Sequence, residues 1–177
     1  MTRRLDAEVK GKFFQLAAQL MTSVSEKHLK LANKALVDIL GLAWNELDPE
    51  EYYPTTLFGL FVDTYAQAVG NADDAIIRLG KRVYPTIKCT VGLPDCLKTP
   101  KEFIKFEAAG YLLNHQGTDI ISRKIIEETD NSITMYAPSV GYNEKLYEGV
   151  WLGILEMINV NTGRVEKVGE HTYRISW

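Results

Sequence analysis

The chain has 177 residues, of which 46% are apolar and 24% charged, and its formal net charge is -3. That length and balance fit one globular domain over residues 1–177, with enough apolar side chains to bury a core. The sequence has no basic block, which argues against a nucleic-acid partner. No apolar run approaches the length of a membrane span or a signal segment, so we expect a cytoplasmic protein without a membrane span.

The first part of the chain, about residues 1–117, is predicted to be helical. Its apolar residues recur at intervals of three and four, the spacing of one buried helix face. Ser25 and Gly41 are typical of the start and end of a helix, and Thr99 with Glu102 forms a capping-box pattern. The predicted helices cover residues 5–24, 26–40, 57–70, 72–84 and 100–116, and a loop or broken helix is expected over 85–98.

The remaining part, about residues 118–177, has the pattern of strands. Polar turn residues at 129–132 separate two β-branched runs, which predicts a hairpin, and 163–177 predicts a second one. A helix with an apolar stripe is expected over 142–161. The order strand-strand-helix-strand-strand predicts an α+β fold in which the N-terminal helical layer packs on a four-stranded antiparallel sheet.

Tyr111 and His115 lie four residues apart on a predicted helix and therefore share one face. They could bind a ligand, or they could complete a core helix. A histidine at a helix end interacts favourably with the helix dipole when charged, and a buried tyrosine usually finds one hydrogen-bond partner. Cys89 and Cys96 do not form a close-spaced ligand pair, so no metal site is predicted.

Two stretches carry a resemblance to a known group of domains. They are "DPEEYYPTTLFGLFVDTYAQAVGNADDAIIRLGKRVYP" and "LYEGVWLGILEMINV". Their order resembles the ligand-binding domains of the NO signalling/Golgi transport fold, which include haem-nitric-oxide/oxygen-binding (H-NOX) and 4-vinyl-reductase-type domains. The resemblance covers most of the chain from Asp48 onward and implies a sensory domain that binds a small molecule.

Haem is the candidate cofactor that this resemblance implies. Haem-binding members carry an axial histidine on the helix before the first hairpin, so the resemblance implies His115 or Tyr111 as the axial ligand. Such members also hold the haem propionates with a Tyr-x-Ser-x-Arg triad in the second strand. The nearest stretch here is "MYAPSVGY", in which Tyr136 and Ser139 have a different spacing and the arginine is absent. The haem motif is therefore not intact.

A cavity for a small apolar molecule is the second kind of site that the sequence suggests. Gly149 and Gly153 lie four residues apart in the last long helix, which favours close packing or, with aromatic neighbours, an apolar cavity. An aromatic set at helical spacing is also typical of a solid core. The candidate ligand-binding residues are Phe61, Tyr65, Tyr84, Phe106, Tyr111, His115 and Trp151.

No catalytic site is predicted, because the sequence contains no recognisable nucleophile, phosphate-binding or metalloprotease motif. We therefore expect a non-enzymatic sensory module that binds a small apolar molecule and signals through a partner protein or a homodimer. The apolar first helix, with Phe13, Phe14 and Leu20, favours the homodimer. The alternatives are a haem-binding sensor of NO or O2 with the same fold, and a scaffolding homodimer without a ligand.

Overall fold

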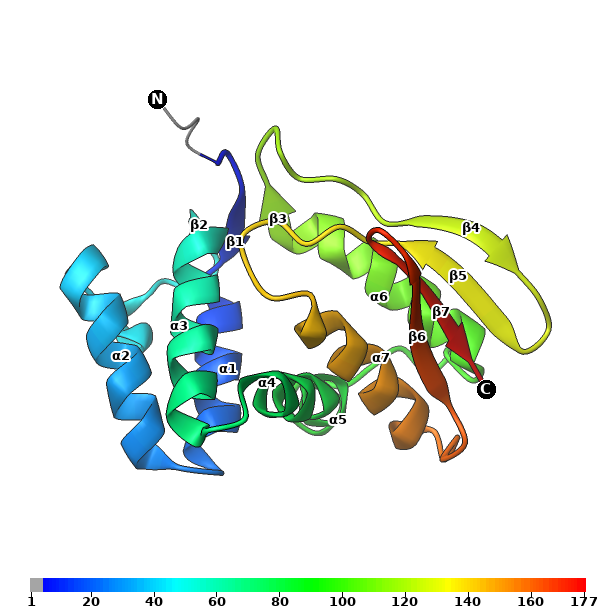
Figure 1. Ribbon diagram of the computed structural model, residues 1–177, viewed down its shortest axis with the longest axis horizontal. Coiled ribbons are helices and arrows are strands. Elements are labelled where there is room, and N and C mark those ends of the chain that lie inside the picture. Colours follow the sequence, from blue (N-terminus) through cyan, green and yellow to red (C-terminus); the bar gives the residue numbers. More distant parts are fainter. Residues whose placement is uncertain (1–4) are drawn as a thin grey trace.

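The structure is a computed structural model that describes residues 5–177 (Figure 1). Its α-helices are α1 (Lys12–Thr22), α2 (Glu26–Leu40), α3 (Thr55–Val69), α4 (Ala72–Lys81), α5 (Val83–Thr90), α6 (Pro100–Asn114) and α7 (Lys145–Met157). Its strands are β1 (Glu8–Lys10), β2 (Tyr52–Pro54), β3 (His115–Gln116), β4 (Lys124–Glu128), β5 (Ser132–Tyr136), β6 (Arg164–Gly169) and β7 (Thr172–Ser176). A short 3-10 helix, η1, covers Trp44–Glu46. The fold is α+β, as predicted.

The predicted four-stranded antiparallel sheet is confirmed, with strand order β4-β5-β7-β6. Ile133 of β5 pairs with Ile175 of β7, and both side chains are fully buried. They pack in one core with Tyr84 of α5, with apolar residues of α6, and with Trp151 of α7. The helices that cover the sheet are therefore α6 and α7, and the predicted position of α7 between the two hairpins is confirmed.

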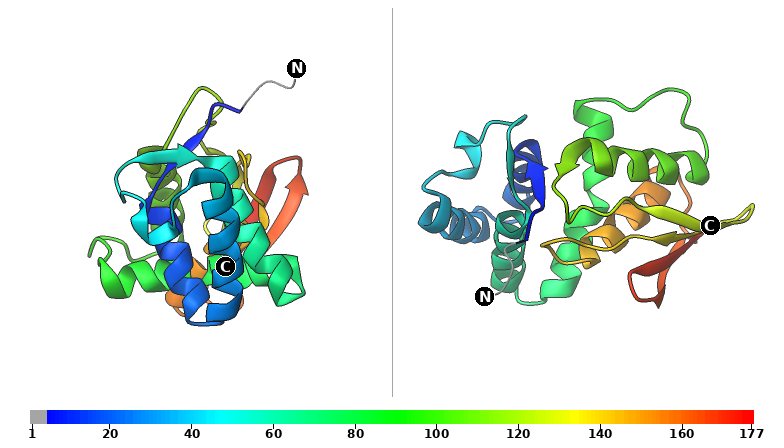
Figure 2. Two further views of the ribbon diagram at one scale, coloured as in Figure 1. Left: turned by 90° about the vertical axis from the view of Figure 1, so that its left-hand side faces the viewer. Right: turned by 90° about the horizontal axis from the view of Figure 1, so that it is seen from above.

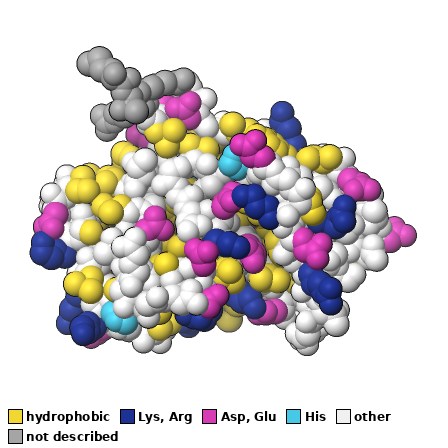
Figure 3. All heavy atoms as spheres, in the orientation of Figure 1, with side chains coloured by type: hydrophobic (Ala, Val, Ile, Leu, Met, Phe, Trp, Pro, Cys, Tyr) yellow, Lys and Arg dark blue, Asp and Glu magenta, His cyan; other side chains and the backbone are white. Residues whose placement is uncertain are grey.

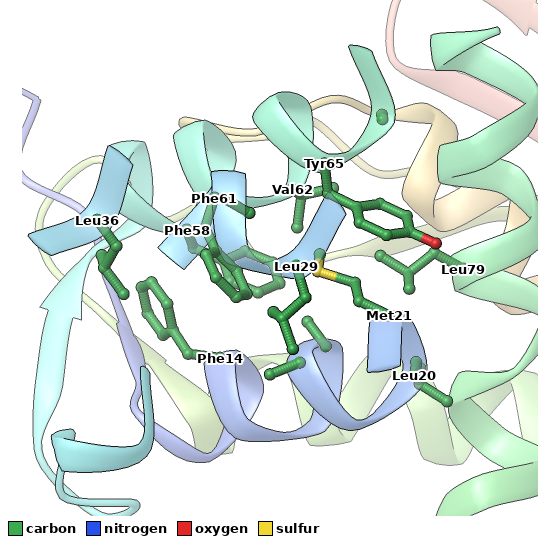
Figure 4. Packing of buried hydrophobic residues seen from close by; sticks show 14 of the residues in the cluster. Phe14, Leu20, Met21, Leu29, Leu36, Phe58, Phe61, Val62, Tyr65 and Leu79 are labelled. Carbon is green, nitrogen blue, oxygen red and sulfur yellow. The ribbon is translucent and has the colours of Figure 1, made fainter. Parts of the chain in front are cut away.

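The first three helices form a separate core at the other end of the molecule (Figure 2). Phe14 of α1, Leu36 of α2 and Phe61 of α3 point into this core, and each is fully buried (Figure 4). Leu20 also lies in it with 2% exposure. Because Phe14 and Leu20 are buried within one chain, they do not supply the apolar surface on which the homodimer prediction relied.

Helices α4 and α7 cross at a pair of glycines. A Cβ atom at Gly80 would lie 2.5 Å from the Leu146 carbonyl oxygen and 2.9 Å from the Val150 backbone nitrogen. A Cβ atom at Gly149 would meet the Ile77 carbonyl in the same way. The absence of a side chain at Gly80 therefore lets α7 approach α4 closely.

Helix boundaries were predicted correctly at the helix ends where the sequence contains capping residues. The Ser25 hydroxyl accepts a hydrogen bond from the His28 amide at the start of α2, and Gly41 ends that helix with φ of 75°. Thr99 and Glu102 form the predicted reciprocal capping box at the start of α6. These ends depend only on neighbouring residues, which is why the sequence indicates them.

Two predictions about the first half were wrong. Residues 8–10 form β1, so the first helix begins at Lys12 and not at Leu5; β1 exists because it pairs with β2 on one side and β3 on the other. The single helix predicted over 72–84 is instead two helices, because α4 ends at Lys81 and α5 runs from Val83 to Thr90, into the segment expected as a loop or broken helix. Pro85 lies in the first turn of α5, where proline removes no intrahelical hydrogen bond.

The surface seen in Figure 3 mixes positive and negative side chains and shows no region of one sign. Within residues 5–177, no helix is both long and apolar enough to cross a membrane. Cys89 and Cys96 are both exposed, so neither packs in the core. The described residues contain no group of three or more histidine, cysteine, aspartate or glutamate side chains that could hold a metal ion.

Candidate ligand-binding cavity

A cavity of about 780 Å³ lies between α1 on one side and α6 on the other. Residues of α5 and α7 complete its walls. Its volume is in the range of pockets for small molecules, about 300–1,000 Å³. Its apolar lining residues include Phe13, Leu16, Phe58, Leu79, Val83, Ile87, Phe106, Leu113 and Val150. The cavity therefore offers a mainly hydrophobic surface to a ligand.

A buried ion pair stands at the wall of this cavity. The guanidinium of Arg123, which follows β3 in the chain, pairs with the carboxylate of Glu107 on α6. Their side chains are only 3% and 9% exposed. The indole nitrogen of Trp151 on α7 donates a second hydrogen bond to Glu107, over 3.0 Å. Three elements thus converge on one carboxylate.

Aromatic rings surround the Arg123 cation. Its guanidinium carbon lies 4.3 Å from the ring centre of Tyr147, 4.7 Å from that of Tyr111 and 5.6 Å from that of Trp151. These distances allow cation–π attraction, which is strongest when the cation is desolvated. Burial alone would lower the pKa of Arg123, but Glu107 and the neighbouring tyrosines raise it above its usual value, so Arg123 stays charged.

A chain of hydrogen bonds runs along the same wall. The Tyr147 hydroxyl donates to the Tyr142 hydroxyl over 3.0 Å, and Tyr142 lies 3.1 Å from Nε2 of His115. Nδ1 of His115 lies 2.8 Å from the Tyr111 carbonyl oxygen. Because a carbonyl can only accept, the network assigns the proton to Nδ1 and makes Nε2 the acceptor for Tyr142.

His115 is a neutral side chain in this setting. Burial is the main cause that lowers the pKa of His115 to about 4, and the Arg123 cation adds to it, while the hydrogen bond to the Tyr111 carbonyl opposes it. The residue lies at the end of α6, as predicted. It does not make the predicted dipole interaction of a charged histidine, because burial, together with the nearby Arg123 cation, disfavours the charge.

We expect the stability of the protein to fall as the pH is lowered from 6.5 to 4. The pKa of His115 is below its ordinary value of 6.5 in the folded chain, so the unfolded chain binds more protons in this interval. The stabilisation is complete above pH 6.5, and its loss at low pH amounts to about 3 kcal/mol. Urea unfolding at several pH values measures it. In His115→Gln this part of the pH dependence should disappear, and an unchanged slope would assign it to other groups.

The structure places the predicted site residues in three different positions. Tyr84, Phe106, Tyr111 and His115 line the cavity. Phe61 and Tyr65 belong instead to the core of α1, α2 and α3. Trp151 is fully buried behind Glu107, which it contacts through its indole nitrogen.

Neither Arg123 nor Glu107 was predicted as a site residue, although the sequence contains one indication for Glu107. The buried positions of α6 are Phe103, Ile104, Glu107 and Tyr111, which form one helical stripe. A carboxylate in an apolar stripe predicts a buried partner for its charge. No local pattern identifies Arg123 as that partner, because it reaches Glu107 only after the chain has turned back through β3.

Comparison with known proteins indicates the fold. No family model and no curated protein matches the chain. Among solved structures, the Fe(II) unliganded H-NOX protein from K. algicida matches with 17% identity and a TM-score of 0.63, over 94% of this chain and 95% of that one. A structure described as modulating haem redox potential through protein-induced porphyrin distortion matches with 12% identity and a TM-score of 0.66. The match covers 95% of this chain and 99% of that one.

A variant of the T. Tengcongensis H-NOX domain matches with 8% identity and a TM-score of 0.57, over 94% of this chain and 93% of that one. The chain therefore has the fold of H-NOX domains, and the resemblance inferred from the sequence is confirmed at the level of the fold. These likenesses extend over nearly the whole described chain.

The residues at the cavity do not fit haem in this arrangement. An axial histidine needs a ring nitrogen whose lone pair is available to iron, but Nε2 of His115 accepts the hydrogen bond of Tyr142. Tyrosine ligates iron as the phenolate, and burial raises the pKa of Tyr111, which disfavours that form. Both candidate axial ligands are thus in the wrong state.

The residues that could bind the haem propionates are also unsuitable in this arrangement. Tyr136 lies against His171 and does not line the cavity. The Ser139 hydroxyl donates to the Tyr142 carbonyl in its own loop. Among residues 5–177, Arg123 is the one arginine that lines the cavity, and Glu107 already neutralises it. None of these three residues is therefore free to hold a propionate in this arrangement.

Proposed function

We propose that the protein is a non-enzymatic sensory module that binds a small, largely apolar molecule in the cavity between α1 and α6. The observation that carries the proposal is the cavity itself, which combines apolar walls with a few buried polar groups at one side. This is the usual composition of a small-molecule site. The H-NOX fold supports the proposal, because solved neighbours with this fold are described by their haem and its distortion.

Native mass spectrometry of the freshly purified protein, beside the denatured mass of the same sample, tests this proposal. We expect a small organic adduct that is lost on denaturation. An adduct of haem mass together with a Soret band would replace the proposal with the haem-sensor alternative. The bare chain mass in both samples, with no binding of added apolar probes, would favour the scaffold alternative.

Two variants at Gly110 test whether an apolar probe binds in this cavity. Gly110 borders the cavity, and an added Cβ atom would have no neighbour within 4 Å. Gly110→Leu should therefore fill part of the cavity and lower the affinity for an apolar probe such as 2-ethylnaphthalene by about tenfold. Gly110→Ala is the matched control and should leave the affinity nearly unchanged. Equal binding by both variants would place the probe elsewhere.

The output of the module is proposed to pass through a partner protein or a homodimer. Sedimentation at micromolar concentration distinguishes the two. A monomer with and without the bound molecule would leave a partner protein as the only route of the proposal.

A further inference from the structure

A second, smaller cavity lies where α1, α3, α4 and α7 meet, and we call it the α4 cavity. Its volume is about 410 Å³, which is within the range of about 300–1,000 Å³ for small-molecule sites. Leu20 and Leu79 line both this cavity and the large one, so the two lie close together. Among residues 5–177, no residue of α6 lines the α4 cavity, so it is a separate site.

Apolar side chains form most of the lining of the α4 cavity. They come from α1 and the turn after it, from α3 and from α4, and they are Leu20, Val24, Tyr65, Val69, Ala75 and Leu79. Leu20, Tyr65 and Leu79 lie close to one another at the end of the helical core next to α4 (Figure 4). Because the removal of apolar surface from water is favourable, this lining favours a ligand with an apolar body.

The other lining residues are charged, and positive charge is in excess. They are the cations Arg78, Lys81 and Arg82 and one carboxylate, Glu156. Lys81 pairs with Glu156 over 2.6 Å, so the charges of the two arginines are not balanced by a carboxylate of the cavity. The C-terminal end of α4 contributes only about half of a negative charge. The α4 cavity therefore keeps a net positive charge.

The two arginines can meet a ligand, because both residues are exposed to solvent. They lie four residues apart on α4 and its C-cap, a spacing that places them on the same side of the helix. Nη1 of Arg82 donates to the Ser23 hydroxyl over 2.6 Å, which holds the side chain in place. A guanidinium has five N–H donors, so others remain available for a ligand. The Arg78 guanidinium forms no ion pair with a carboxylate among residues 5–177.

A carboxylate is the anion that suits this cavity best. The planar guanidinium matches the geometry of a carboxylate or a phosphate, with which it forms paired hydrogen bonds. The cost of taking an anion out of water rises with its charge. Because most of the lining is apolar, a singly charged carboxylate is favoured over a doubly charged phosphate.

We propose that the α4 cavity binds a small apolar carboxylate, whose charged end pairs with Arg78 and Arg82 and whose body lies against the apolar lining. This site is additional to the large cavity of the proposed function. It takes a different class of ligand, because its arginines lack the carboxylate partner that Arg123 has in Glu107.

Equilibrium dialysis of the full chain with two probes of similar shape tests this inference. The probes are 2-naphthoate, which carries a carboxylate, and 2-acetylnaphthalene, which carries a neutral carbonyl. We expect the carboxylate to bind about tenfold more tightly than the ketone, as one or two charge-assisted hydrogen bonds allow. Raising the salt concentration from 50 to 500 mM should weaken the binding of the carboxylate severalfold, because salt screens exposed charges.

Three variants locate the carboxylate. Arg78→Gln should lower the affinity for 2-naphthoate about fivefold and leave that for 2-ethylnaphthalene unchanged. Arg174→Gln is the matched control, because it removes the same charge from an exposed residue that lines neither cavity. Gly110→Leu, which fills part of the large cavity, should also leave the affinity for 2-naphthoate unchanged.

The possible outcomes separate this inference from the proposed function. Equal affinities of the wild-type protein for carboxylate and ketone would overturn the inference, and so would equal losses in Arg78→Gln and Arg174→Gln. A loss of 2-naphthoate binding in Gly110→Leu but not in Arg78→Gln would place the carboxylate in the large cavity, against the inference. If 2-naphthoate binding depends on Arg78 while no neutral probe binds, the inference stands and the proposed function falls.

Discussion

Replacing Glu107 by alanine is expected to lower the free energy of unfolding by about 3–5 kcal/mol, because it leaves a buried cation without its partner. The Arg123 side chain is 3% exposed, so water cannot take the place of the carboxylate without a rearrangement. The indole of Trp151 loses its acceptor in the same variant. The aromatic rings around Arg123 compensate only in part, since a desolvated cation–π contact contributes about 2 kcal/mol. Urea unfolding measures the change.

Two further variants test whether the loss of stability in Glu107→Ala comes from the buried ion pair. Glu128 pairs with Lys101 and Lys105 on the surface, so Glu128→Ala removes a carboxylate with two cationic partners and should have a much smaller effect. Glu107→Leu combined with Arg123→Met removes both charges and should recover most of the loss, because apolar pairs of similar volume often replace buried ion pairs well. A loss in Glu107→Ala no larger than in Glu128→Ala would contradict the buried pair.

Gly80→Ala is expected to have the second largest effect, at the upper end of the about 1–3 kcal/mol that overpacking costs. The new methyl group would lie 2.5 Å from the Leu146 carbonyl oxygen. That atom belongs to the backbone of α7 and cannot turn aside as a side chain could. Helices α4 and α7 would have to separate, although alanine favours a helix more than glycine does. Thermal or urea unfolding measures the loss.

Gly110→Ala is the control, and we expect it to change the stability of the protein in the opposite direction. Gly110 also lies inside a helix, but a methyl group there would have no atom within 4 Å. The substitution should stabilise the protein by about 1 kcal/mol, the difference in helix propensity. If both alanine variants changed stability equally, the close approach of α4 and α7 would not be the cause.

The sequence predicted those parts of the fold that depend on neighbouring residues. The capping box at Thr99, the cap at Ser25 and the two hairpins each arise from side chains a few positions apart, and each is present. Strands of two or three residues, such as β1 and β3, are too short to show an alternating pattern. They form only because distant segments meet.

The candidate site was predictable in part for the same reason. Tyr111 and His115 could be recognised from their spacing on one helix, and both line the cavity. The state of His115 could not be recognised, because its neutrality depends on burial and on Arg123, which approaches from another segment. Phe61 and Tyr65 have the same aromatic pattern but face the core of α1, α2 and α3, since the pattern does not say which partner a helix face meets.

The pairing of β1 with β3 has a mechanical consequence. Helix α6 passes directly into β3, and β1 is separated from α1 by Gly11 alone, so one short ladder ties together the two helices that wall the cavity. Asp6 and Thr118 extend this tie with a hydrogen bond beyond the ladder. The ladder therefore restrains the spacing of α1 and α6 at this end, and the spacing is freer to change away from it. A pair of spin labels on α1 and α6 remote from the ladder would report a change in the width of the cavity, whereas a pair beside the ladder would remain nearly still.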